Sequence, residues 1–351
     1  MISAMVDAAG EAGTRAPDDR RCAVRHASTA RRASRSSRWS DGDRCCGDRE
    51  RIAAHGRRPR TDHLRALMHS REASQPKTIV ITGASGGIGA AAARQLHRAG
   101  HRVVIVGRSA QKTEAVAREL GADHLTADFA RLADVRTLAA ELAASYPRID
   151  VLANNAGGIF GDRTKTIDGF EKTVQINHLA PFLLTTLLLD TLIASSASVI
   201  QTSSAGARLF GRLDLDDLDH DRDFSPQLAY GTAKLENILF TTELHRRYHA
   251  QGLSAAAFHP GLVATGFATQ SDSVMKRFYS SRLGRAMMST PDEGADQLVW
   301  LATATPGSEW QSGQYYEKRK PARRNHPQAL DRDLARQLWN RSAGLLAGHT
   351  H

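Results

Sequence analysis

Cysteine is scarce in this 351-residue chain, and the three cysteines, Cys22, Cys45 and Cys46, all lie within the first 67 residues. The rest of the chain therefore has no thiol for a disulfide bond or a thiolate metal site. We expect no bound metal.

Long hydrophobic runs are also lacking. The N-terminus has no continuous apolar segment like that of a signal peptide, and its acidic residues argue against a mitochondrial transit peptide. The longest apolar stretch, residues 179–194, is interrupted by Thr185, Thr186 and Asp190 and is short for a bilayer span. These absences predict a cytoplasmic protein without a membrane partner.

Residues 1–67 contain only six Leu, Ile, Val or Phe residues, too few to form a core. They hold 15 arginines against nine acidic residues, so most of the net charge of +10 falls here. We expect a disordered, dispensable Arg-rich extension. Three interpretations stay open: a basic arm for nucleic acid, a plain extension, or untranslated sequence ahead of a start at Met68. The arginines are interleaved with acids and lack a spaced aromatic series, so nucleic acid is not the expected partner.

From Lys77 onward, short β-branched runs alternate with helical segments, which is the pattern of parallel βαβ units. The expected strands are 77–82, 102–106, 124–127, 149–153, 198–203, 254–258 and 313–316. The expected helices are 87–99, 111–119, 131–145, 168–192, 227–250, 291–303 and 329–346. Strands 78–81 and 103–106 are apolar throughout, as a parallel sheet covered on both faces requires. The pattern predicts one α/β domain over 75–346, with a Rossmann-type doubly wound parallel sheet flanked by helices.

A glycine-rich turn, residues 82–89, follows the first expected strand and leads into a helix. Glycine lets the chain turn sharply and lets a pyrophosphate approach the backbone, while the helix N-terminus offers free N–H groups to the anion. This position between strand and helix favours a dinucleotide site over a plain structural turn. The candidate cofactor-binding residues in the turn are Gly83, Ser85, Gly87, Ile88 and Gly89.

The second expected strand ends in Val106-Gly107-Arg108-Ser109, without the acid that an NAD site usually presents to the ribose hydroxyls. Arg108 can instead make a charge-assisted contact with a 2′-phosphate. We therefore expect NADP(H) as the cofactor; the alternative is an exposed loop arginine.

Tyr230 and Lys234 lie one helical turn apart. A free tyrosine, with a pKa of about 10, is a poor proton donor near pH 7, and a neighbouring ammonium favours its ionised form. Such a pair can protonate the alkoxide that forms when a hydride reduces a carbonyl. The same spacing recurs at Tyr316 and Lys320, but Tyr316 closes the last expected strand, so we expect no helix to align that pair.

The spacing of Gly83, Gly87 and Gly89 resembles the glycine motif of the short-chain dehydrogenase/reductase family. Further motifs follow in that family's order: Asp128, Asn154-Asn155-Ala156-Gly157, Asn177, Ser203-Ser204, Tyr230 with Lys234, Pro260-Gly261, and Thr265. The resemblance covers about residues 75–340. It is strongest for retinol-dehydrogenase-like and WW-domain-oxidoreductase-like members.

This resemblance implies an oxidoreductase with a catalytic set of four residues. Tyr230 would transfer the proton, Lys234 would favour the ionised form of Tyr230, Ser204 would bind the substrate carbonyl, and Asn177 would hold a water against Lys234. For the cofactor, it implies that Asp128 contacts the adenine, Asn155 and Gly157 line the adenosine side, and Thr265 reaches the nicotinamide end; Tyr230, Lys234, Pro260 and Gly261 complete the set. A homodimer through 168–192 and 227–250 is expected from the family alone.

Taken without the resemblance, several of these residues have plainer interpretations. Asp128 is equally well a helix N-cap, and Asn154 a turn residue. Asn177 is a mid-helix irregularity. Their serial order is what favours the functional interpretation.

One departure from the family is the 26-residue separation of Ser204 and Tyr230, which is longer than is common there. The extra segment, 207–228, includes an acidic run and is expected to form a loop beside the substrate cleft. Apolar residues near the expected cleft favour a hydrophobic aldehyde, ketone or alcohol, or else belong to the core: Phe160, Phe210, Leu262, Phe267 and Phe278. Two other classes stay open, a sensor that binds NADP(H) without turnover and a nucleic-acid-binding protein.

Overall fold

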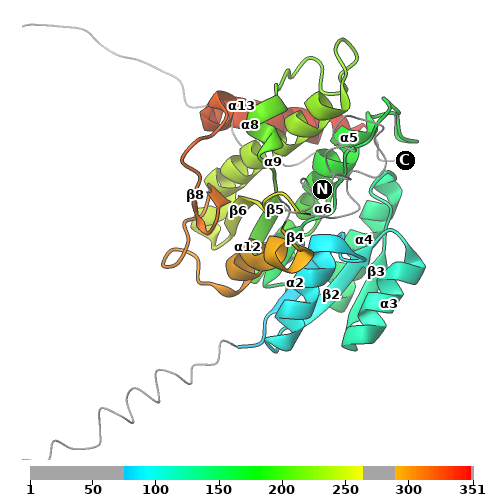
Figure 1. Cartoon of the computed structure of the whole chain (residues 1–351), viewed down its shortest axis with the longest axis vertical. Helices are drawn as coiled ribbons and strands as arrows, with labels where there is room; N and C mark the ends of the chain where they lie inside the picture. Colours follow the sequence, from blue (N-terminus) through cyan, green and yellow to red (C-terminus); the bar gives the residue numbers. More distant parts are fainter. Residues whose placement is uncertain (1–74, 264–288, 349–351) are drawn as a thin grey trace, which may run out of the picture. The chain divides into compact units, whose positions relative to one another are not determined.

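An eight-stranded sheet, ordered β3-β2-β1-β4-β5-β6-β7-β8, forms the centre of the computed structural model, which describes residues 75–263 and 289–348 (Figure 1). The strands are β1 (Thr78–Thr82), β2 (Arg102–Gly107), β3 (Asp123–Thr126), β4 (Val151–Asn154), β5 (Ser198–Thr202), β6 (Ser254–His259), β7 (Gln314–Glu317) and β8 (Lys320–Pro321). All pairs are parallel except β7 with β8. The strand order reverses between β1 and β4, and in such sheets ligands bind at this point. The predicted doubly wound fold is confirmed.

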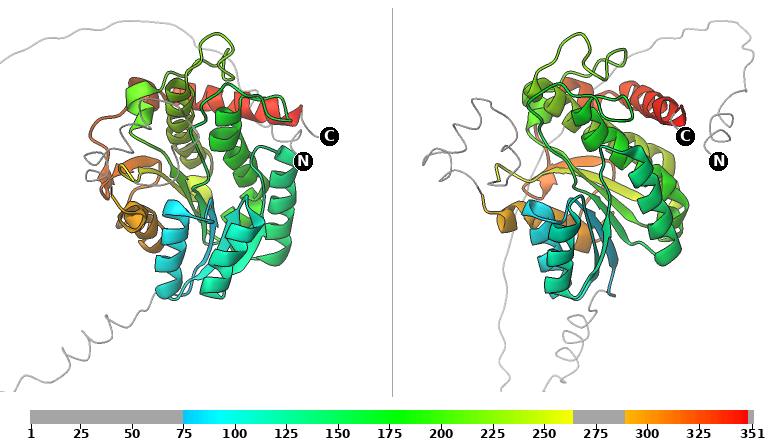
Figure 2. Two further views of the ribbon diagram at one scale, coloured as in Figure 1. Left: turned by 45° about the vertical axis from the view of Figure 1, so that its right-hand side comes forward. Right: turned by 90° about the vertical axis from the view of Figure 1, so that its right-hand side faces the viewer.

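Helices cover both faces of the sheet (Figure 2). One face carries α2 (Gly87–Arg98), α3 (Ala110–Leu120) and α12 (Pro291–Thr303), whose apolar side chains pack on residues such as Ile79 and Ile105. The other face carries α4 (Leu132–Ser145), α6 (Ala180–Leu187) and α9 (Pro226–Tyr248), which pack on Val80, Leu152 and Val199. Burial on both sides explains why the central strands are apolar throughout.

The expected single helix over 168–192 is wrong in its detail. Helix α5 (Lys172–Val174) begins only after Glu171, whose side chain caps it by accepting from Val174 N at 2.9 Å. One π-helical turn (Gln175–Leu179) then leads into α6, and α7 (Leu189–Ala194) follows a break at Leu188. A π turn inserts an extra residue and is common at functional sites. Apolar periodicity alone does not reveal it.

The C-terminal helix α13 (Arg332–Ala347) packs across helices α6 and α9 (Figure 2). The Trp339 ring lies 4.9 Å from Phe182 and 5.5 Å from Phe240, measured between ring centroids. The helix expected over 329–346 is confirmed, and it packs on the body of the domain. The homodimer expected through the same two helices stays a prediction, and it would have to use faces that α13 leaves uncovered.

Candidate active site

A cavity of about 670 Å³ opens where the parallel strands end, at the reversal of strand order. Its wall includes nearly all of the residues that the sequence predicted for the cofactor: Gly83, Ser85, Gly87, Ile88, Gly89, Arg108, Asp128, Asn155, Gly157, Tyr230, Lys234, Pro260 and Gly261. Thr265 lies outside the described residues, as do Phe267 and Phe278. Residues that are far apart in the sequence, from Gly83 to Gly261, therefore line the same cavity.

The glycine turn is shaped for close approach of a ligand to the backbone. Gly83 adopts φ +66°, and a Cβ at Gly89 would lie 2.5 Å from the Gly83 carbonyl oxygen. The N-cap of α2 is Gly86, so no side chain caps this helix, and its first turn holds no acid. The free N–H groups and the helix dipole at this end suit an anion such as a pyrophosphate.

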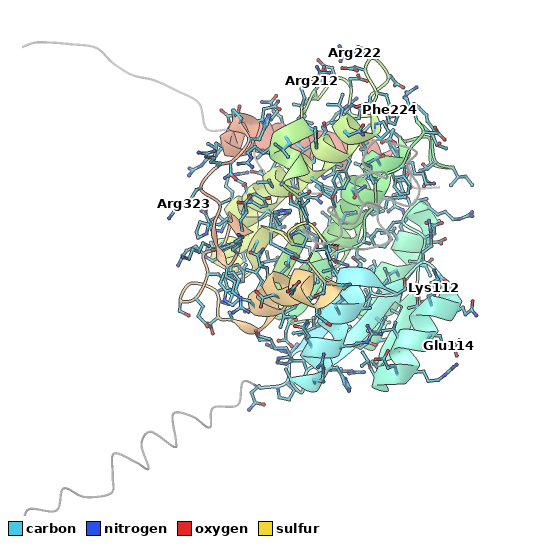
Figure 3. The ribbon with its side chains drawn as sticks, viewed as in Figure 1. Lys112, Glu114, Arg212, Arg222, Phe224 and Arg323 are labelled. Carbon is cyan, nitrogen blue, oxygen red and sulfur yellow. The ribbon has the colours of Figure 1, made fainter. Side chains whose placement is uncertain are left out.

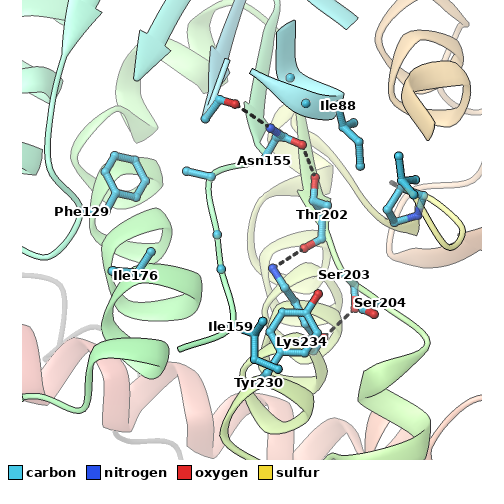
Figure 4. Close-up of a pocket in the computed structure, with 18 of the residues that line it drawn as sticks. Ile88, Phe129, Asn155, Ile159, Ile176, Thr202, Ser203, Ser204, Tyr230 and Lys234 are labelled. Carbon is cyan, nitrogen blue, oxygen red and sulfur yellow. Dashed lines mark hydrogen bonds between the residues drawn. The ribbon is translucent and has the colours of Figure 1, made fainter. Parts of the chain in front are cut away.

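Asn155 braces this turn from the neighbouring strand, as Figure 4 shows. Its Nδ2 donates to the Thr82 carbonyl at 2.9 Å, and the Thr82 hydroxyl accepts from Asn155 N and Ala156 N at 3.0 Å each. Asn154 is buried instead and donates to Thr185 Oγ1 at 2.9 Å, so it is not a turn residue. The two asparagines therefore have different tasks.

The π turn places Asn177 against the backbone of the cavity wall. Asn177 Nδ2 donates to the Gly158 carbonyl at 2.9 Å, and Asn177 Oδ1 accepts from Gly158 N at 3.1 Å. A Cβ at Gly157 would lie 2.5 Å from Asn177 Oδ1 and 3.0 Å from Lys234 Nζ. Asn177 and Lys234 therefore flank Gly157, where only glycine fits.

Tyr230 and Lys234 project from the first turns of α9 into the same end of the cavity (Figure 4). The Lys234 Nζ lies 5.5 Å from the centre of the Tyr230 ring and donates to the Thr202 carbonyl at 3.0 Å. Lys234 is only 2% exposed, and this burial lowers its pKa to about 7. The lysine thus exchanges protons near neutral pH.

Ser204 lies beside Tyr230, just after β5. A Cβ at Gly206 would lie 3.4 Å from Ser204 Oγ and 3.3 Å from Tyr230 Cε1, so both side chains border the same small space. Ser204 Oγ accepts from Gly206 N at 3.1 Å. Ser203 is buried and donates to the Lys234 carbonyl at 2.7 Å, which is a structural role. Of the serine pair, Ser204 is the one that lies beside Tyr230.

The second Tyr-x-x-x-Lys pattern has no such geometry. Tyr316 lies in β7 and Lys320 in β8, across a hairpin. The Tyr316 hydroxyl donates to the Gln311 carbonyl at 3.1 Å. The expectation that no helix aligns this pair is confirmed.

The part of the cavity beside Arg108 includes a residue that sequence reasoning missed. Lys112, in the first turn of α3, lines the cavity together with Arg108. Within the described residues neither side chain forms an ion pair, whereas nearby Arg102 and Arg118 pair with Asp123 and Glu114. The four-residue spacing of Arg108 and Lys112 was the available signal. Two unpaired cations at this place suit a phosphate.

Asp128 and His259 also line the cavity. Asp128 Oδ1 accepts from Ala130 N at 3.0 Å, as in a turn, and does not cap α4, whose N-cap is Arg131. His259 was not predicted; its Nδ1 accepts from Ala205 N at 3.3 Å, and burial, with Arg208 nearby, lowers its pKa to about 4. His259 is therefore neutral and ties the end of β6 to the segment after Ser204.

The expected loop at 207–228 starts with a short helix, α8 (Gly206–Phe210), and continues as an extended loop whose arginines lie exposed above the ribbon (Figure 3). Ion pairs join this loop to the neighbouring 160–171 segment, including Arg163 with Asp221 and Lys165 with Asp219. Asp219 Oδ1 also accepts from Glu171 N at 2.9 Å. These contacts hold the 207–228 insertion against residues 163–171, the segment that precedes the π turn.

An unpaired acid lies under this insertion. Glu236 on α9 is 0% exposed, and neither of its oxygens has a hydrogen-bond partner among the described residues. Burial, followed by the nearby charges of Glu171 and Asp219, raises the pKa of Glu236 well above its usual range. Glu236 is therefore neutral in the folded protein at pH values where it ionises in the unfolded chain.

This burial predicts that Glu236→Gln stabilises the fold increasingly as pH rises above about 4.5. A raised folded-state pKa gives stability that is complete at low pH and is lost as pH rises toward that pKa. Thermal midpoints of both proteins across pH 5–9 would measure this. Glu243→Gln is the matched control: Glu243 is buried on the same helix, but hydrogen bonds from Arg246 and Arg247 outweigh burial and lower its pKa. Glu243→Gln should lower the thermal midpoint at neutral pH. An equal lowering of the midpoint in Glu236→Gln would contradict the prediction.

The comparisons with known proteins agree with this geometry. A family model described as short chain dehydrogenase matches residues 77–214. A Streptomyces sp. (strain C5) protein named "Putative daunorubicin C-13 ketoreductase DnrU" is 45% identical to this chain, covering 76% of this chain and 91% of its own. The chain belongs to the short-chain dehydrogenase/reductase family.

Two further proteins are similar to most of this chain. Human retinol dehydrogenase 13 is 36% identical over 77% of this chain and 84% of its own. A crystal structure of an uncharacterized protein from Mycobacterium paratuberculosis is 34% identical, with a TM-score of 0.62 over 78% of this chain and 97% of its own. Members of this family are oxidoreductases that use nicotinamide cofactors and act on small molecules.

Two kinds of feature are absent from the described part of the chain. None of its helices is both long and apolar enough to cross a bilayer. None of its groups of His, Cys, Asp and Glu is arranged to hold a metal ion.

Proposed function

We propose that this short-chain dehydrogenase/reductase transfers a hydride between NADP(H) and a hydrophobic carbonyl or alcohol. The observation that carries the proposal is the meeting of Tyr230, Lys234 and Ser204 at one end of a cavity whose other end is the glycine turn. The residues present fit a dinucleotide, because the turn is free of side chains and the uncapped helix α2 points its N–H groups there.

Each catalytic side chain has a distinct task in this proposal. When bound, the nicotinamide supplies or accepts the hydride. Ser204 hydrogen-bonds the substrate oxygen, and Tyr230 gives or takes the proton at that oxygen. Lys234, half ionised near pH 7, favours the phenolate and passes protons onward. Asn177 fixes the wall at Gly157 and Gly158, beside Lys234.

The unpaired cations at the adenosine end support NADP(H) over NAD(H). Arg108→Ala should weaken NADP(H) binding about 10- to 100-fold, the range of a charge-assisted hydrogen bond, and leave NAD(H) binding almost unchanged. Lys112→Ala should act in the same direction. Fluorescence titration with both reduced cofactors would measure this.

Arg118→Ala is the control for these variants, because Arg118 lies in α3 but pairs with Glu114. It should change neither affinity. Equal losses for NADPH and NADH in Arg108→Ala would show that Arg108 does not read the 2′-phosphate.

Apolar side chains around the mouth of the cavity support a hydrophobic substrate. Leu209 and Phe210 on α8 line the cavity and yet are 61% and 43% exposed. Helix α8 is held tightly against α9, since a Cβ at Gly231 would lie 2.7 Å from Gly211 N. The apolar side chains are therefore fixed beside Gly231, the residue that follows Tyr230, and can receive the apolar part of a substrate.

Phe210→Ser should raise KM for a bulky apolar ketone about ten-fold, the scale of losing part of a buried aromatic contact, with little change in kcat. Leu330→Ser is the matched control, since Leu330 is 69% exposed but does not line the cavity. Steady-state kinetics with a bulky and a small ketone would separate the two. An unchanged KM for the bulky ketone would count against the apolar mouth.

A further inference from the structure

Three polar side chains without a role in the proposed chemistry are buried beside the catalytic helix. They are His178 in the π turn, Asn237 on α9 and Ser342 on α13, and they are 1%, 2% and 0% exposed. Polar groups are costly to bury unless they are hydrogen-bonded. Their arrangement therefore calls for a physical reason.

His178 and Asn237 each form a hydrogen bond, but to different partners. His178 Nε2 lies 2.8 Å from Ser342 Oγ, which ties the π turn to helix α13. Asn237 Nδ2 donates to the Thr202 carbonyl at 3.3 Å, and that same carbonyl accepts from Lys234 Nζ at 3.0 Å. The Thr202 carbonyl thus connects Asn237 to the catalytic lysine.

Two further buried atoms of these side chains, one on His178 and one on Asn237, can form a hydrogen bond with each other. Neither His178 Nδ1 nor Asn237 Oδ1 has a hydrogen-bond partner among the described residues. The His178 ring lies 6.4 Å, between centroids, from Phe240, which follows Asn237 by one turn on the same buried face of α9, so His178 and Asn237 are close. Burial lowers the pKa of His178 to about 3, so the ring is neutral. A neutral imidazole carries one N–H, and an amide oxygen only accepts. A proton on Nδ1 satisfies both atoms and leaves Nε2 to accept from the Ser342 hydroxyl.

We propose that His178 is a positioning residue for Lys234. Its Nδ1–H donates to Asn237 Oδ1, directly or through one water, and this contact holds the Asn237 amide on the Thr202 carbonyl that anchors Lys234. Ser342 fixes the other edge of the ring to α13. Helix α13, from the far end of the sequence, thereby helps to set the geometry of the active site. The role in turnover rests on the proposed function.

A plain structural role is the competing explanation. The His178 ring lies 6.1 Å from Phe182 and 6.4 Å from Phe240, between centroids, in the aromatic cluster that also holds Trp339. In that case only packing and the Ser342 contact would matter. The test must therefore separate the two edges of the ring.

Two amide substitutions separate these edges, because an asparagine amide reaches about as far as Nδ1 and a glutamine amide about as far as Nε2. His178→Asn should keep the contact with Asn237 and therefore keep kcat within about three-fold. It should lower the thermal midpoint, because the hydrogen bond to Ser342 is lost. His178→Gln should keep the Ser342 contact and lose about five- to ten-fold in kcat, the scale of one oriented hydrogen bond, with KM and the Kd for NADPH unchanged. If His178→Gln retains kcat as well as or better than His178→Asn, the role of His178 is only structural and the proposal is wrong.

Ser195→Ala controls for a general loss of stability. Ser195 is buried away from the cavity, accepts from Ile149 N at 3.1 Å and donates to the Thr191 carbonyl at 2.7 Å. It should lower the thermal midpoint and leave kcat unchanged. A drop in kcat equal to that of His178→Gln would overturn the positioning role.

The tautomer of His178 gives a readout that needs no activity. ¹⁵N NMR of histidine-labelled protein at neutral pH, assigned with His178→Gln, should show His178 protonated on Nδ1. A proton on Nε2 would contradict the proposal even if the enzyme is active. An Nδ1 proton in a protein that reduces no carbonyl would leave the contact standing and count against the proposed function instead.

Discussion

Tyr230→Phe should lower turnover by at least about 10²- to 10⁴-fold, the range that general acid–base catalysis contributes. The substitution keeps the ring that borders Gly206 and faces Lys234 and removes only the hydroxyl. NADPH affinity should barely change, because the glycine turn and Arg108 are untouched. Steady-state kinetics together with a fluorescence titration of NADPH would measure both quantities.

Tyr316→Phe is the matched control within the same chain. It removes the same hydroxyl from the same four-residue motif, but at a β-strand position whose hydroxyl bonds to Gln311. It should cost some stability and leave turnover intact. Near-normal turnover in Tyr230→Phe with loss in Tyr316→Phe would reverse the assignment.

Lys234→Met should suppress turnover by about 10²-fold or more, because the phenolate of Tyr230 loses its neighbouring cation and the proton loses its path. Some loss of NADPH affinity should accompany it, since Lys234 lines the same cavity as the glycine turn. The pH dependence of kcat supplies a second measurement. A limb near pH 7, where Lys234 titrates, should disappear in the variant.

Lys320→Met is the control for this loss, since Lys320 is exposed in β8 and belongs to the second motif. It should leave kcat and its pH profile unchanged. A wild-type profile without any limb between pH 6 and 8 would show that Lys234 does not titrate during turnover.

Most of the fold could be predicted from the sequence because local signals agree with the tertiary structure. The apolar strands β1 and β2 are buried on both faces, so their composition predicts a central parallel sheet. The glycine turn and the strand-to-helix pattern around it predict a dinucleotide site, and in the structure this turn lines the cavity. The π turn at Asn177 could not be predicted, because apolar periodicity shows neither the cap at Glu171 nor the contacts of Asn177 with Gly158.

The candidate site was predictable where its residues follow strand ends and was missed where it depends on packing. Lys112 was overlooked because helix α3 offers many charged residues and only the fold turns this one toward the cavity. His259 and His178 carry no local signal, since their partners Ala205 and Ser342 are far away in the sequence. Motif order predicts which groups react, and burial in the structure indicates which groups hold them in place.

The most direct test of the central claim follows the hydride itself. The full chain is incubated with NADPH deuterated on either face of nicotinamide C4 and with a panel of apolar ketones and aldehydes, and the alcohol products are analysed by mass spectrometry. The proposal predicts that deuterium from one face appears on the former carbonyl carbon, and that Tyr230→Phe forms almost no labelled product while still binding NADPH. Bound NADPH without labelled alcohol from any member of the panel would contradict the claim and favour a cofactor sensor.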